Sequence, residues 1–269
     1  MSDGCSHGDP PNEKTTDIDI CRSLPAMAVV CGRIVGLLVC TASGFGCGPT
    51  PEQLVQNAEI WLQSRDWAQL KSHLDTEYTD PLGDRDRLLR DLADLDRDHP
   101  DWLIRWSQEG YRTRTTALFA DVEARLNARL RGQPEWRIEG TMTVSLHQSD
   151  RWRIQGGLLT DLRDIRGLMA ERRAALEAND AEGLTALLHP SYRDGLIDRD
   201  EAAARLARDV RGTAIRLRPS LYRVDVRPDL AHVDEHYRMS INGQEQPAAV
   251  AGMTLRKTAG RWRIAGGLY

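Results

Sequence analysis

The chain has 269 residues, of which 41% are hydrophobic and 28% charged, ordinary values for a globular protein with a packed core. Its 36 basic and 40 acidic residues nearly cancel, so no strong field is expected and nucleic acid is excluded as a partner on that ground. All 5 cysteines lie at or before Cys47, which excludes disulfides and thiolate metal sites from the rest of the chain.

The first 26 residues are rich in Gly, Pro, Asp and Ser and poor in apolar side chains. They cannot bury enough apolar surface to offset the entropy lost on ordering, so we predict a disordered extension over 1–26. Met27 is an alternative start. An uncharged, apolar to small stretch then runs from Ile34 to Gly46. It is too short to span a hydrocarbon core, which needs about 20 residues.

A basic residue, a short apolar run and small residues before a break are typical of a secretory signal. Cys47 follows Gly46 and precedes a Gly-Pro-Thr-Pro tether, and this arrangement resembles a bacterial lipoprotein signal. The resemblance implies that Cys47 is acylated and becomes the mature N-terminus. The departure is Gly44, where such signals usually carry Leu. Cys40 is a poorer candidate because Val39 is branched.

We therefore expect residues 27–50 to be a lipoprotein-type signal and tether, with lipid attached at Cys47. The protein would be exported and held at the cell envelope, since two or three acyl chains suffice to hold a soluble body on a membrane. A plain signal peptide, an uncleaved anchor and a buried apolar strand are the alternatives.

The rest of the chain contains an internal repeat. Leu62-x-x-x-Asp66 matches Leu176-x-x-x-Asp180 at an offset of 114 residues (176 − 62). Tyr111-Arg112 matches Tyr222-Arg223 at 111 (222 − 111), and Trp152-Arg153-Ile154 matches Trp262-Arg263-Ile264 at 110 (262 − 152). Small deletions between elements explain the changes in offset. The pattern indicates a duplication.

Each copy begins with a helical pattern. Leu54, Ala58, Trp61 and Leu62 recur on one face of an amphipathic helix. A polar break over 64–66 precedes a second helix. Asp198 with Glu201 predicts a capping box that opens a third helix through Val210, and Asp84 begins its counterpart in the first copy.

The second part of each copy is predicted to be antiparallel sheet. Polar and apolar residues alternate from Asp121 to Leu130, which indicates a strand with one face on a core. Asn242-Gly243 is a strong hairpin signal, and each copy closes with a Trp-Arg-Ile strand.

This order resembles the nuclear transport factor 2-like superfamily, which includes ketosteroid isomerases, scytalone dehydratase and SnoaL-like polyketide cyclases. The resemblance rests on element order, the Tyr-x-Asp at Tyr78 and Tyr192, and the closing strand motif. It implies an α+β fold of two tandem cone-shaped domains, 51–160 and 161–269, each with N-terminal helices packed on a curved antiparallel sheet.

The resemblance also implies a pocket between the helices and the concave face of the sheet. Copy two places Glu235 on that face, where copy one has Ala124. Tyr222 precedes it on the neighbouring strand and Tyr237 follows, so these three residues are the candidate pocket. A carboxylate on an apolar face can serve as a general base. The alternatives are a place near the open rim or a pair with an arginine such as Arg216.

Other patterns do not predict chemistry. His232, Asp234 and His236 alternate on the opposite strand face, but copy one has Asp, Glu and Arg there, as on a solvated surface. No metal site, cofactor, phosphate-binding loop or catalytic residue is assigned.

The leading hypothesis is a non-catalytic, membrane-anchored module that binds a small apolar ligand or a protein partner. The alternative is an isomerase, dehydratase or cyclase whose second domain is active. A structural pseudo-dimer with sealed cones is a third hypothesis.

Overall fold

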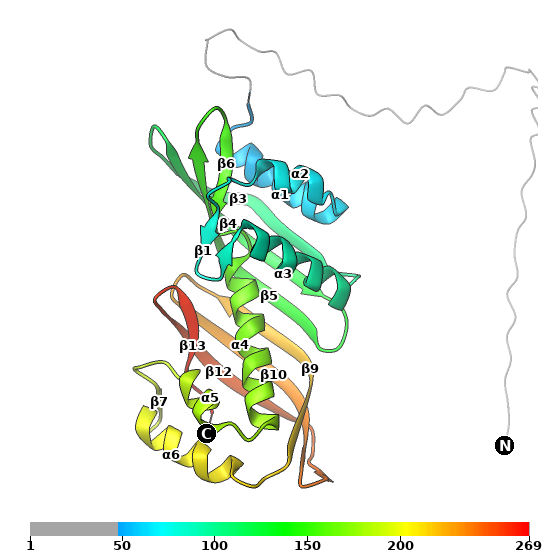
Figure 1. The fold of residues 1–269 in the computed structure, drawn as a ribbon, viewed down its shortest axis with the longest axis vertical. Coiled ribbons are helices and arrows are strands. Elements are labelled where there is room, and N and C mark those ends of the chain that lie inside the picture. Colours follow the sequence, from blue (N-terminus) through cyan, green and yellow to red (C-terminus); the bar gives the residue numbers. More distant parts are fainter. Residues whose placement is uncertain (1–47, 269) are drawn as a thin grey trace, which may run out of the picture. The chain divides into compact units, whose positions relative to one another are not determined.

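The structure, a computed structural model, describes residues 48–268. The predictions for the N-terminal extension, the signal segment and Cys47 lie outside the described residues. The α+β class is confirmed, because helices pack on one face of a large, mainly antiparallel sheet (Figure 1). Within 48–268, no helix is long and apolar enough to cross a membrane.

The two copies contain the same elements in nearly the same order. Copy one comprises α1 (Pro51–Ser64), α2 (Trp67–His73), β1 (Thr79–Asp80), β2 (Gly83–Asp84), α3 (Arg85–Asp98), β3 (Leu103–Thr115), β4 (Phe119–Leu130), β5 (Glu135–Gln148) and β6 (Trp152–Gly156). Copy two comprises α4 (Thr160–Glu177), α5 (Ala181–Ala186), β7 (Arg193–Asp194), β8 (Ile197–Asp198), α6 (Arg199–Val210), β9 (Ile215–Val226), β10 (Leu230–Ile241), β11 (Gln244–Glu245), β12 (Ala249–Thr258) and β13 (Arg261–Gly266). The short hairpins β1–β2 and β7–β8 were not predicted, because two-residue strands show no periodicity.

Local sequence accounts for the helix ends. The Asp84 carboxylate accepts the Arg87 amide at the start of α3. Asp198 does the same for α6 with the amides of Asp200 and Glu201, so the predicted helix start is found. The Glu201 side chain accepts from Arg205 and does not complete the predicted capping box. Satisfying these otherwise unpaired donors is worth about 1 kcal/mol per cap.

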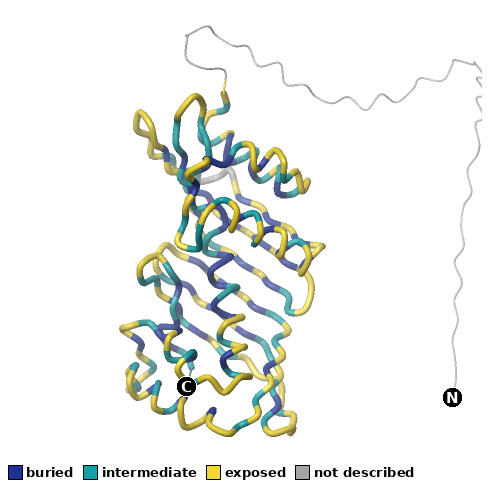
Figure 2. Tube along the Cα trace, viewed as in Figure 1, coloured by how far each residue is buried: buried dark blue, intermediate teal, exposed yellow. Residues whose placement is uncertain are grey.

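Buried and exposed residues alternate along the long strands, as Figure 2 shows by alternating colours. In β4 the predicted apolar face is buried, from Val122 at 0% exposure to Leu126 at 3%. The other face of β4 carries mostly exposed polar side chains, apart from the half-buried Glu123. The burial of one strand face against the helices explains why the register cannot slip by one residue.

One sheet runs through both copies. Its strand order is β13-β12-β10-β9-β5-β4-β3, and β6 and β11 add to β5 and β10. All pairs are antiparallel except β5 with β9, where 135–140 lie alongside 221–226. At the end of this join a Cβ on Gly140 would lie 2.2 Å from the Val226 carbonyl oxygen, so the close approach requires glycine there. The two predicted domains therefore share a continuous sheet.

The connecting helix α4 holds the copies together through adjacent side chains. Arg163 donates to Asp80 at 2.7 Å and to Asp91 at 2.6 Å, both in copy one. Asp164 accepts the Trp262 amide at 2.7 Å and the Arg261 guanidinium at 2.8 Å, both in copy two. The Arg163 side chain is 3% exposed, so this is a buried ion-pair network.

Candidate functional site

Glu235 lies on β10 beneath α4 and is fully buried, at 0% exposure. The Tyr222 hydroxyl donates to its Oε1 at 2.7 Å, and Arg172 Nη1 on α4 donates to its Oε2 at 2.7 Å. The Tyr222 ring stacks on Trp136 of copy one, with centroids 4.0 Å apart. The carboxylate therefore sits in a buried network of charged and aromatic groups next to the join between the copies.

Two of the three predicted pocket residues come together in this network. Among the described residues, Tyr237 makes no hydrogen bond or ring contact with this network. A β-bulge between His236 and Tyr237 interrupts the pairing of β10 with β9, and Tyr237 lines another hollow that also includes Pro219. The ion-pair partner of Glu235 is Arg172 rather than Arg216.

Sequence reasoning missed Arg172, although the repeat contained a signal for it. At the offset of 114 residues, Arg172 stands where copy one has Ala58, just as Glu235 stands where copy one has Ala124. Both members of the ion pair therefore replace alanine. Two charged residues that replace small apolar ones in the same copy are a reason to test whether they pair.

The geometry limits what Glu235 can do chemically. Each carboxylate oxygen already accepts a strong hydrogen bond, and Glu235 lines none of the main hollows within 48–268. Burial and the neighbouring carboxylate raise the pKa of Tyr222, so its phenol stays neutral and acts as a donor. The arrangement fits a structural ion pair better than a general base.

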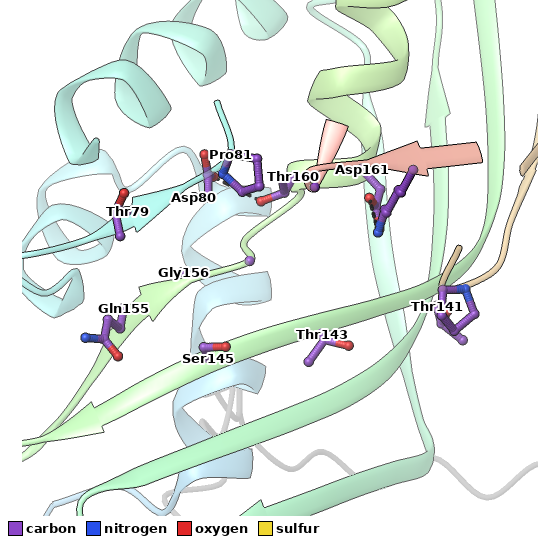
Figure 3. Close-up of a pocket in the computed structure, with 14 residues that line it drawn as sticks. Thr79, Asp80, Pro81, Thr141, Thr143, Ser145, Gln155, Gly156, Thr160 and Asp161 are labelled. Carbon is purple, nitrogen blue, oxygen red and sulfur yellow. Dashed lines mark hydrogen bonds and ion pairs between the residues drawn. The ribbon is translucent and has the colours of Figure 1, made fainter. Parts of the chain in front are cut away.

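A hollow of about 600 Å³ lies between the copies and is called here the polar hollow (Figure 3). Thr141 and Thr143 line one side, along the stretch of β5 between its pairing with β9 and its pairing with β6. Thr160 and Asp161, at the start of α4, lie on the other side.

The charged groups of the polar hollow are already engaged. Lys257 Nζ lies 2.8 Å from Asp161 Oδ1 and 4.8 Å from the centre of the Trp262 ring. Asp80 accepts from Tyr78, Thr160 and Arg163. The remaining polar lining consists of uncharged side chains, among them Thr141, Thr143 and Gln155.

A second hollow, of about 370 Å³, is called here the aromatic hollow. Trp136 and Tyr222 line one wall, and α4 lines the other through Arg166, Met169, Ala170 and Arg173. Asp98 and His99, at the end of α3, close one side. The cavity size is within the range of small-molecule sites, and both copies contribute to it.

The histidines on the outer sheet face do not build a metal site. His232 and Asp234 are exposed and line a hollow of about 380 Å³ with Arg137 and Arg223. Among the described residues, no group of three or more His, Cys, Asp or Glu side chains is placed to hold a metal ion.

Comparisons with known proteins give structural neighbours only. No protein-family model matches the chain. A search of curated protein sequences also finds no match.

Similar solved structures include an NTF2-like family protein from Streptomyces avermitilis assigned as a dehydratase (21% identity, 40% of this chain, 92% of that one, TM-score 0.34). They also include a protein from Novosphingobium aromaticivorans assigned as a scytalone dehydratase (20% identity, 40% of this chain, 81% of that one, TM-score 0.34). A third is a Nostoc punctiforme protein of unknown function with a cystatin-like fold (17% identity, 40% of this chain, 89% of that one, TM-score 0.36).

Proposed function

We propose that this protein is a non-catalytic binding module, exported and held at a membrane by a lipid on Cys47. Its ligand is a small, partly apolar molecule that occupies the aromatic hollow. The observation that carries this proposal is the pair of stacked rings, Trp136 and Tyr222, facing a stripe of α4 across a cavity built by both copies.

Two features favour this hollow over the alternatives. The polar hollow offers mainly hydroxyl groups, and its charges are paired with one another. The interior of copy two is occupied by the Glu235–Arg172 pair, which an apolar ligand cannot displace without leaving a buried charge unpaired.

Binding is tested by adding small aromatic and aliphatic compounds to the full chain and following backbone amide shifts by NMR. We expect saturable shifts at 133–136 and 166–173. Ala170→Trp fills the hollow from an exposed position of α4 and should abolish them. Ala174→Trp, exposed one turn further along and outside the hollow, is the matched control. Absence of any saturable binder would contradict the proposal.

The enzyme alternative makes a different prediction for the same experiment. Glu235 is buried, as that alternative requires, and binders would then shift the amides of 231–235 on β10. Saturable shifts confined to that strand would favour an isomerase-, dehydratase- or cyclase-type function over a binding module.

Anchoring is tested on the protein from its native host. Intact mass of membrane-extracted protein should match a chain that begins at an acylated Cys47. Cys47→Ala should release the protein from the membrane fraction, whereas the matched variant Cys40→Ala should not. A mass that retains Met1 and carries no lipid would refute anchoring and leave the binding proposal standing.

A further inference from the structure

Arg166 projects from α4 into the aromatic hollow with little support from the protein. Its side chain is 20% exposed, and the nearest acidic oxygen, Asp98 Oδ2, lies 3.7 Å away. That distance is too long for a hydrogen bond. Asp98 is also engaged by Arg97 Nε at 3.2 Å. No residue within 48–268 accepts a hydrogen bond from the Arg166 guanidinium.

Burial lowers the pKa of Arg166, which means that the surroundings disfavour its charge. A partly desolvated cation whose donors are unmatched is stabilised by an anion that enters from solvent. The fork of guanidinium donors matches a carboxylate in particular, because two parallel hydrogen bonds form at once.

The positions along α4 suggest the shape of that anion. Arg166, Met169, Ala170 and Arg173 are spaced i, i+3, i+4 and i+7, so they share one helix face. The two arginines are about 10 Å apart along the axis, at 1.5 Å per residue. Between them lie the buried Met169 and the small side chain of Ala170, opposite the Trp136 and Tyr222 rings.

The lining of the hollow carries more positive than negative charge, and the Asp91 and Asp94 carboxylates attract Arg166 from outside the lining. Arg166 and Arg173 face it, and Asp98 is the one acidic residue among its described lining residues. Burial lowers the pKa of His99, so this imidazole is neutral at pH 7 and adds no positive charge that could attract an anion. By contrast, the lysine of the polar hollow already has a carboxylate partner.

We infer that the aromatic hollow binds a small carboxylate with an apolar body, its carboxylate on Arg166 and its body between Met169 and the Trp136–Tyr222 wall. This inference rests on the proposed function and names the chemical class of its ligand. Arg173, which is exposed, attracts the anion at the mouth of the hollow and contributes less to its affinity.

The probes are naphthalene-2-carboxylate and decanoate, each matched to its neutral amide, titrated into the full chain by calorimetry. We expect both carboxylates to bind and both amides to bind roughly 10- to 100-fold more weakly, the worth of charge-assisted hydrogen bonds. Arg166→Gln should weaken carboxylate binding by the same factor and leave amide binding unchanged. Arg173→Gln should weaken it about threefold.

The control is Arg208→Gln, a substitution on the exposed face of α6 whose side chain is 72% exposed. It should change nothing. Equal affinity for carboxylates and amides, with the NMR shifts still at 133–136 and 166–173, would overturn the carboxylate inference and leave the binding site in place. Carboxylate binding unaffected by Arg166→Gln would also overturn it. Failure of all four probes to bind, with Ala170→Trp silent, would count against both proposals.

Discussion

The two copies use the same interior position in opposite ways. In copy two, Tyr222 donates to Glu235, which is paired with Arg172. In copy one the equivalent tyrosine is Tyr111, and its buried hydroxyl has no hydrogen-bond partner among the described residues. The comparison shows that this backbone accepts either an ion pair or an apolar core at one place.

The volume lost in copy one is restored by aromatic residues. Trp61 and Trp106 stand where copy two has Ala175 and Leu217. The Trp106 indole donates to the Val55 carbonyl at 3.2 Å, so its polar atom is satisfied. Cores tolerate such exchanges when total volume is kept.

The sheet edges differ as well. The first half of β5 in copy one pairs with β9, and so joins the copies. The counterpart in copy two contains Pro247, and β12 begins only at Ala249. Proline has no amide proton to give to a ladder, so this edge cannot repeat the join.

The largest loss of stability is expected from replacing Arg163, the residue of the connecting helix α4 that pairs with two aspartates of copy one. Arg163→Met leaves Asp80, which is 2% exposed, without its cation, and it removes the buried partner of Asp91, which keeps only the exposed Arg87. We expect a loss of about 5 kcal/mol, the upper end of the range for breaking a buried pair. Chemical denaturation measures it. Arg87→Met, which removes only an exposed partner of Asp91, should cost less than about 1 kcal/mol.

The ion pair of copy two should be replaceable by the apolar solution of copy one. Arg172→Met alone leaves Glu235 buried with Tyr222 as its sole partner, and we expect a loss of about 3 kcal/mol. Adding Glu235→Leu should recover most of that loss, because no buried charge remains. If the double variant is as unstable as Arg172→Met alone, the loss does not come from an unpaired buried charge, and the prediction is wrong. Denaturant midpoints provide the test.

The two tyrosines give the sharpest matched pair. Tyr222→Phe removes a donor from a buried carboxylate and should cost about 1–3 kcal/mol. Tyr111→Phe removes a hydroxyl that has no partner, so stability should stay the same or rise slightly. Thermal unfolding of both variants measures the difference. Equal losses would show that the Tyr111 hydroxyl also has a hydrogen-bond partner in the folded protein.

The smallest effect concerns alkaline pH. Burial and nearby Glu59 raise the pKa of Tyr111 to about 12, above the ordinary value near 10. A raised folded-state pKa stabilises the protein fully below pH 10, and this contribution is lost as pH rises toward 12. The free energy of unfolding of the Tyr111→Phe variant should therefore fall less steeply between pH 9.5 and 11 than that of the parent protein. A parallel decline would contradict the assignment.

Local sequence determined much of the fold. The aspartates at 84 and 198 predicted two helix starts, because a short carboxylate caps free amides wherever a helix begins. Alternation over 121–130 predicted a strand with one buried face, and the repeat offsets predicted that both segments contain the same elements. Each of these signals lies within a few residues or within a self-comparison of the chain.

Tertiary structure decided the rest. The parallel join of β5 to β9, the clamp of Arg163 on copy one and the pairing of Arg172 with Glu235 all link residues that are 63 or more positions apart. No periodicity encodes which of many arginines meets which carboxylate. The sequence placed Glu235 on an apolar face, but only packing against α4 determined that this face is sealed. The hollow that remains lies beside it, where the two copies meet.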